Sequence, residues 1–396
     1  MTAPRWHDLT LRIVTPAFLG TFPDEAVKGD RTTRQTIPFP IPSLRGALGY
    51  WLRALAGAHL GNDLTALLTA ESAVFGAART ATTGGPSPLL LRGPRIGLTA
   101  YPVKQAAFGT KYLLGPGLLG SPPPRCLPDG TTLNLRVKNT GTALHADLFL
   151  AALWGLRTFG GLGARTRRGL GTLAVTTVPA LDTRHFDPAW LATDSPSDLG
   201  AVLNCVRNVL NDLAIPTTPN QNQPRYPCFA ENHYTTAPDD DLGSGSTANA
   251  LATTGEWWRN FRLGGDRHGP GAARTATYDT VAKPFLDGGH PQAPLLAGAL
   301  GLPIPYQDKR AGRTAIAETV LDGAPARRAS PIWLRVTKRG PAWKLRSLAF
   351  HAEWLPPEAN LRIRNPKTHH TINITAPTPE QIRTEINRWF HHPDHT

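Results

Sequence analysis

The sequence has few cysteines and no long apolar run. The three cysteines, Cys126, Cys205 and Cys228, are far apart and form no C-x-x-C pair. So sparse a set argues against a disulfide framework and a zinc site, and it indicates a reducing compartment. Met1 to Asp8 contains no apolar signal-peptide region, and no run reaches the length of a membrane span. We therefore expect a cytoplasmic protein that holds no metal and no cofactor.

Acidic residues are also scarce relative to basic ones. The chain has 42 Lys and Arg residues against 29 Asp and Glu residues, which gives a net charge of +13. This excess indicates an anionic partner, and arginine, which far outnumbers lysine, matches phosphate geometry better than lysine does. A GC-rich genome produces the same bias, so the charge alone does not identify the partner.

No Walker phosphate loop, G-x-x-x-x-G-K-[ST], is present. The stretch 159–172 (FGGLGARTRRGLGT) instead combines glycines, which permit positive φ and close approach, with arginines that bind phosphate in a bidentate manner. We predict that it binds a polyanion backbone. The alternative is a glycine-rich turn with solubilising arginines. The residues predicted to bind are Gly160, Gly161, Gly163, Arg165, Arg167, Arg168 and Gly169.

The length of 396 residues favours two domains, which we place at residues 1–180 and 181–396. In the first, the patterns predict strands at 9–14, 89–98, 131–137 and 170–178, and helices at 44–57 and 143–159. This order, β-α-β-β-α-β, is that of a ferredoxin-like fold in the α+β class. Arg45 and Arg53 lie off the apolar stripe of the first helix. They belong either to a solvated face or to one that contacts a polyanion backbone lying along the helix.

The second domain is predicted to be an α+β unit with large insertions. A polar segment at about residues 214–255 is expected to be disordered, and Asp239 to Asp241 are predicted to be a solvated charge run. A hairpin is expected from the strands on either side of 338–341. The last helix is expected to have Thr378 as its N-cap and Gln381 in a capping box. Trp257 and Trp258 either stack on bases or pack between helices.

Three stretches together resemble a known family. The sequences 41–57 (IPSLRGALGYWLRALAG) with 71–78, 159–173 (FGGLGARTRRGLGTL), and 301–306 with 327–338 are similar to the RAMP superfamily, and within it to the first Cmr subunit of type III-B CRISPR effector complexes. The resemblance implies tandem ferredoxin-like RAMP domains and a subunit without a catalytic role of its own. It also implies that the chain holds the 3′ region of CRISPR RNA and the complementary target RNA in antiviral defence, beside other Cmr/RAMP subunits. By position it assigns RNA-facing roles to Arg45, Arg53, the loop from Gly160 to Gly169, and the pair Arg327 and Arg328.

Two other functions stay open at this point. A metal-independent endoribonuclease of the kind that processes CRISPR transcripts needs a general base, for which His59 is the best placed residue and His145 the next. A structural adaptor would use its positive charge to dock on neighbouring subunits. His369-His370 and His391-His392 lack spaced partners and indicate no metal site.

Overall fold

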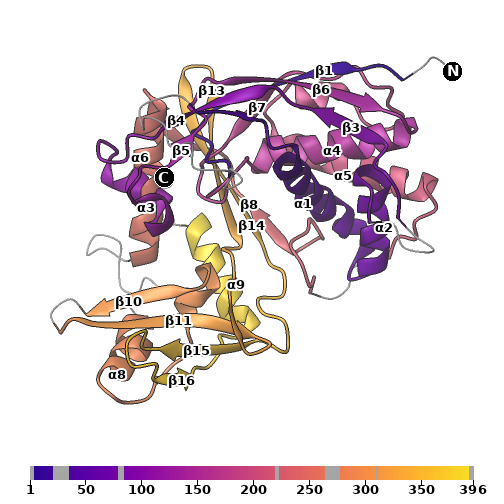
Figure 1. The fold of residues 1–396 in the computed structure, drawn as a ribbon. Helices are drawn as coiled ribbons and strands as arrows, with labels where there is room; N and C mark the ends of the chain where they lie inside the picture. The colour runs from indigo at the N-terminus through magenta and orange to yellow at the C-terminus, as the bar shows by residue number, and fades with distance from the viewer. Residues whose placement is uncertain are drawn as a thin grey trace.

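The computed structural model describes residues 4–20, 35–78, 84–218, 223–263, 277–308 and 311–391. Its N-terminal part contains the predicted ferredoxin-like sheet (Figure 1). Four antiparallel strands lie in the order β3-β6-β1-β7. Their bounds are β1 His7–Ile13, β3 Leu89–Arg92, β6 Thr132–Asn139 and β7 Leu173–Thr177. The alternating burial of β1 and β6 places one face of the sheet on the core, as a period of two requires. The α+β fold class is confirmed.

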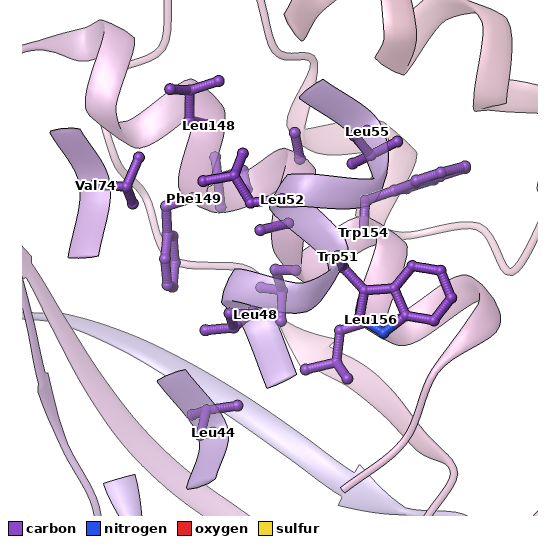
Figure 2. Packing of buried hydrophobic residues seen from close by; sticks show 14 of the residues in the cluster. Leu44, Leu48, Trp51, Leu52, Leu55, Val74, Leu148, Phe149, Trp154 and Leu156 are labelled. Atoms are coloured by element: carbon purple, nitrogen blue, oxygen red, sulfur yellow. The ribbon is translucent and has the colours of Figure 1, made fainter. Parts of the chain in front are cut away.

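Helices cover the buried face of this sheet. They are α1 Ile41–Leu60, α2 Leu64–Phe75, α4 Ala143–Phe159 and α5 Leu199–Asp212. Helix α4 has the predicted bounds, and all its residues from Ala146 onward are buried, because it contacts α1, α2 and α5 as well as the sheet. Figure 2 shows the seam in which Leu48, Leu52 and Trp51 of α1 face residues of α4. Helix α5 packs on α1 and α4, so a segment beyond residue 180 shares this core; the domain boundary stays a prediction.

The predicted strand 89–98 is in fact two strands. β3 ends at Arg92, and β4 (Arg95–Ala100) joins β2 (Gln35–Pro38) and β5 (Arg125–Cys126) in a separate sheet. Gly93 and Pro94 separate the two strands, and proline cannot donate the ladder hydrogen bond that a continuous strand needs. Helix α3 (Phe108–Leu114) packs beside α6 (Thr247–Leu263) through a close approach at Gly109 and Gly255.

Two further antiparallel sheets form the C-terminal part. The predicted hairpin is confirmed as β13 (Ile332–Arg339) with β14 (Ala342–Phe350), and β8 and β9 both pair with β14. A second sheet has the order β10-β11-β15-β16, with β12 on β11. Its strands are β10 Ile304–Asp308, β11 Arg313–Leu321, β12 Ala324–Ala326, β15 Asn360–Arg364 and β16 Thr371–Asn373. The short helix α8 (Lys283–Leu286) packs on β11, and α9 (Pro379–Phe390) has the predicted capping box at Thr378 and Gln381.

The polar segment is more ordered than predicted. β8 (Tyr234–Thr236), β9 (Asp240–Ser244) and the first half of α6 lie within it, whereas 219–222 lie outside the described residues. The disorder expected for 237–254 is corrected here, because β9 hydrogen-bonds along β14 and α6 buries Leu251 and Thr254. Composition does not reveal such partners, since they lie about a hundred residues away along the chain.

Candidate nucleic-acid interface

The glycines of loop 159–172 allow the loop to fold closely on its neighbours. Gly163, Gly169 and Gly171 have φ of 92°, 75° and 71°. A Cβ on Gly163 would lie 2.4 Å from the Phe18 carbonyl oxygen, and one on Gly171 would lie 2.0 Å from that of Leu162. Similarly, a Cβ on Gly160 would lie 2.3 Å from Nε1 of Trp51, and one on Gly161 2.8 Å from the Gly171 carbonyl oxygen. The glycines therefore serve internal packing in this conformation, and their contact with a polyanion stays a prediction.

Hydrogen bonds hold the loop between the two halves of the chain. The Thr15 hydroxyl donates to the Gly169 carbonyl oxygen at 2.8 Å and accepts from the Thr172 amide at 3.0 Å. On the other side, the Leu334 amide of β13 donates to the Arg167 carbonyl oxygen at 3.2 Å. Arg168 and Leu334 form an isolated parallel bridge. The arginines are thus presented from a fixed backbone rather than from a free loop.

The Arg167 guanidinium lies over two aromatic rings. Its guanidinium carbon is 4.5 Å from the ring centroid of Trp333 and 5.7 Å from that of Tyr50. Burial raises the pKa of the Tyr50 phenol, while the positive charge of Arg167 acts to lower it, so Tyr50 is neutral at physiological pH. This arrangement brings a residue of the N-terminal loop, one of α1 and one of β13 to a single place.

The other arginines of the predicted set lie near one another. Burial lowers the pKa of Arg165, and the charge of Arg327 lowers it further. Burial lowers the pKa of Arg168 to about 10, with Arg262 and Arg165 acting in the same direction. Burial and the charge of Arg167 lower the pKa of Arg328. Like charges that depress one another's pKa are stabilised by an anion placed among them.

A cavity of about 340 Å³ opens beside this arginine cluster. The α1 residues Ser43, Ala47 and Tyr50, which lie on one helix face, line one side of it. Gly161 and Thr166 of the loop and Trp333 line the other. The cavity therefore has an aromatic wall and a glycine-rich backbone wall. A base or a sugar-phosphate segment could lie between them.

Arg45 and Arg53 face another part of the molecule. Arg53 forms a 2.5 Å ion pair with Glu71 of α2, and the Arg45 guanidinium donates to the carbonyl oxygen of Phe75 at the end of that helix. Neither residue lines the cavity described above. The structure thus groups Arg165, Arg167, Arg168, Arg327 and Arg328, but it holds these two arginines against α2. Their role in RNA binding stays a prediction.

The two histidines considered as general bases have structural partners. The His59 imidazole Nε2 lies 2.9 Å from the Leu203 carbonyl oxygen of α5, and burial lowers its pKa. His145 completes the N-cap of α4, where its Nδ1 accepts from the Thr142 amide at 2.9 Å. Neither residue lines the cavity beside the arginine cluster. Of the tryptophans, Trp258 is buried and packs edge-to-face on Trp389, with ring centroids 5.1 Å apart.

A buried ion network links the halves, since Arg346 donates to the Thr158 carbonyl oxygen of α4 at 3.0 Å, and sequence reasoning missed it. Arg335 of β13 and Arg346 of β14 contact the Asp194 carboxylate at 3.3 and 2.8 Å. Arg346 also donates two hydrogen bonds to Asp239, each 2.8 Å long. Asp239 therefore does not belong to a solvated charge run, whereas Asp241, 63% exposed, pairs with Lys344 at the surface. The one feature of the sequence that indicated this network is that Arg335 and Arg346 stand among apolar strand residues.

The described part of the chain contains no group of three or more His, Cys, Asp and Glu side chains that could hold a metal ion. Nor does any described helix have the length and apolarity needed to cross a membrane. The arginine cluster, the two aromatic rings under Arg167 and the adjoining cavity form the candidate interface.

Comparison with known proteins gives concordant results. The model of the RAMP superfamily matches residues 10–174. A CRISPR system Cmr subunit, Cmr1-1 of Pyrococcus furiosus, is 28% identical over 147 residues, which are 36% of this chain and 42% of that protein. The match thus spans less than half of the relative.

The fold also resembles solved structures along its whole length. The crystal structure of Cmr1 from Pyrococcus furiosus in its apo form has a TM-score of 0.55 at 17% identity, covering 98% of this chain and 97% of that one. A cryo-EM structure of the Type III-B Cmr-beta bound to cognate target RNA contains a chain with a TM-score of 0.50 at 10% identity, covering 98% and 99%. At such identities the likeness concerns the fold.

Proposed function

We propose that this chain, a RAMP-superfamily protein related to the first Cmr subunit, is a non-catalytic RNA-binding subunit of a type III-B CRISPR effector. In this role it holds the 3′ region of the CRISPR RNA and the complementary target RNA. Its partners are those two RNAs and other Cmr/RAMP subunits. The relatedness supports the assembly, and the arginine cluster supports the contact with RNA.

The observation that carries the proposal is the mutual effect of the clustered arginines. Arg165, Arg168 and Arg328 have lowered pKa values because of burial and neighbouring arginines, and no carboxylate of the described residues is among the groups that act on them. Phosphate groups would supply the missing negative charge and accept bidentate hydrogen bonds. Because base pairing between guide and target reads the sequence, we expect the protein to bind the RNA backbone with little sequence preference.

The test is equilibrium binding of the full chain to single-stranded RNA and to guide–target duplex across a salt series. The variant carries Arg165→Ala, Arg167→Ala and Arg168→Ala. Each lost phosphate contact should lower the slope of log affinity against log salt by roughly 0.7 on a single strand. The matched control removes three exposed charges elsewhere with Arg5→Gln, Arg207→Gln and Lys367→Gln.

An equal loss in the two triple variants would mean that only net charge matters, and the cluster would not be the binding site. The same samples test the endoribonuclease alternative, because cleavage of RNA by the wild type that disappears with His59→Ala would contradict a non-catalytic role. We expect intact RNA throughout, since the His59 imidazole is engaged with Leu203.

A further inference from the structure

A second cavity, of about 290 Å³, lies in the C-terminal half between α9 and the end of β14. It shares no lining residue with the cavity beside the arginine cluster. Its apolar side is formed by Ala352, Pro379, Ile382 and Ile386. Its polar side is formed by Gln223, His233, His351, Glu380 and Arg383. Its volume is at the lower end of the range for small-molecule sites.

His351 is the buried polar group of this cavity. The residue is 6% exposed, and its Nε2 lies 2.7 Å from the Thr235 hydroxyl of β8. The other ring nitrogen, Nδ1, is buried and has no hydrogen-bond partner in the described chain. A buried polar atom left without a partner costs about 1–3 kcal/mol, so native proteins keep few of them. A ligand in the cavity would provide the missing partner.

His233 repeats the pattern on the same wall. Its Nδ1 is also buried, and no described residue hydrogen-bonds to it. The two histidines are connected through the backbone, since the His351 amide donates to the His233 carbonyl oxygen at 2.8 Å. Two unpaired imidazole nitrogens at one cavity suit a ligand with at least two polar atoms.

The charge at the rim indicates the sign of that ligand. Arg383 is exposed on the second turn of α9, and its positive charge adds to burial in lowering the pKa of both His233 and His351. Glu380, one turn earlier, is the one carboxylate that lines the cavity in the described chain. A guanidinium beside two imidazoles favours an oxyanion, and the carboxylate favours a ligand that also carries hydroxyl or amino donors.

We propose that this cavity binds a mononucleotide-sized phosphate ester. Its phosphate would accept from Arg383 and the two imidazoles, and its base would lie against Pro379, the exposed residue of the apolar side. A bare inorganic anion would leave Pro379 in water, and a purely apolar ligand would leave both Nδ1 atoms unpaired. The phosphate could belong to a free nucleotide or to the end of an RNA strand. This site is separate from the proposed RNA interface and does not depend on it.

Binding should be accompanied by proton uptake. A phosphate beside His351 and His233 favours their charged forms and counteracts the charge of Arg383. Glu380, which also lines the cavity, carries a charge of the same sign as the phosphate. At constant phosphate charge, affinity should therefore increase as the pH falls toward about 4, the pKa of His351 in the unliganded protein. The observed binding heat should also depend on the ionisation enthalpy of the buffer.

The experiment is calorimetric titration of the full chain with adenosine 5′-monophosphate, uridine 5′-monophosphate, adenosine, inorganic phosphate and sodium acetate. We expect saturable binding of both nucleotides, at least tenfold weaker binding of adenosine and of phosphate, and none of acetate. Arg383→Gln should weaken nucleotide binding at least tenfold, and His233→Gln should reduce the proton uptake. Lys367→Gln, which removes an exposed charge elsewhere in this half, should change affinity less than twofold.

A short RNA with a 3′-phosphate, compared with the same RNA without it, distinguishes the two sources of the phosphate. No saturable binding of any nucleotide, equal binding to the Arg383→Gln protein, or tighter binding of acetate than of nucleotide would overturn the proposal. The last result would indicate a carboxylate from a protein segment instead. The triple variant Arg165→Ala, Arg167→Ala and Arg168→Ala should bind mononucleotides normally, so failure of the RNA interface and failure of this site are separable.

Discussion

The guanidinium of Arg167 lies over the indole of Trp333, 4.5 Å from its ring centroid, although 166 positions separate the two residues in the chain. The contact joins the glycine-rich loop of the N-terminal half to β13 of the C-terminal half. It also leaves the Nε of Arg167 buried without a partner among the described residues. Ring packing therefore contributes to the position of the arginine.

Replacing Trp333 should weaken RNA binding even if Trp333 does not touch RNA. Trp333→Leu removes the ring under Arg167, and a cation–π contact contributes about 0.5–2 kcal/mol. We expect a two- to thirtyfold loss of RNA affinity, measured at constant salt. Trp333→Phe keeps an aromatic face and should retain most of the affinity. Equal loss in both variants would show that the ring does not position Arg167.

Arg53 should contribute little to RNA binding. Its guanidinium is paired with Glu71, and the pair is partly exposed, so its contribution to stability is at most about 1 kcal/mol. Arg53→Gln should change RNA affinity by less than twofold in the assay used for the arginine cluster. Glu71→Gln serves as the control, because it breaks the same pair but retains the positive charge. A fivefold or larger loss with Arg53→Gln alone would restore the RNA-facing role predicted from its position.

Gly171 should tolerate no side chain. Its φ of 71° and the 2.0 Å approach of a Cβ to the Leu162 carbonyl oxygen predict that Gly171→Ala lowers the free energy of unfolding by about 2 kcal/mol or more. Gly46→Ala, on an open face of α1, should raise it by about 0.5–1 kcal/mol. Urea unfolding of the two proteins gives both values. If Gly171→Ala left the free energy of unfolding unchanged, the loop would have to adopt another conformation readily.

Removing Asp194 should destabilise the joint between the halves. Burial acts to raise the pKa of this carboxyl, but Arg335, Arg346 and the Thr337 hydroxyl lower it to well below its usual range. Asp194→Asn leaves buried arginines without their counter-charge, a change that costs about 3–5 kcal/mol. Asp241→Asn, at the exposed pair with Lys344, should leave the free energy of unfolding nearly unchanged. Comparable losses in the two variants would contradict this assignment.

His351 should make stability depend on pH in a defined window. Burial, with Arg383 and His233, lowers its pKa from 6.5 to about 4. The unfolded chain therefore takes up a proton at this residue as the pH falls below 6.5, whereas the folded chain does so only near pH 4. The free energy of unfolding should fall across this window by up to about 3 kcal/mol from this group. Urea unfolding at several pH values should show a shallower fall in His351→Gln, and parallel curves would exclude the assignment.

Sequence patterns were enough to predict the helices whose positions are determined by residues close together in the chain. The apolar spacing of 143–159 and the capping box at Thr378 and Gln381 predicted α4 and α9 because the signals lie within a few residues. The division of 89–98 into two strands could also have been predicted, because Gly93 and Pro94 are local signals. The packing role of the loop glycines could not be predicted, because the space beside Gly163 is limited by Phe18, which is far away in the sequence.

The charged residues also show which features could be predicted from the sequence and which could not. Composition predicted an anionic partner, but it could not separate arginines that face ligand from those that hold the protein together. In the sequence, Arg335 and Arg346 have the pattern of ordinary strand residues. They can be buried only because Asp194 and Asp239, from other segments of the chain, pair with them. The net charge is a sum over the residues of the sequence, whereas the neutralisation of a given arginine depends on which carboxylates lie beside it in the fold.

The bridge between Arg168 and Leu334 has a consequence for synthesis on the ribosome. The loop emerges from the exit tunnel well before β13 does, so a nascent chain displays the arginines without the strand that orders their backbone. The complete interface exists only once the chain has been made as far as β13. Expression of the N-terminal half alone would therefore give a protein with the right charges and an unformed site.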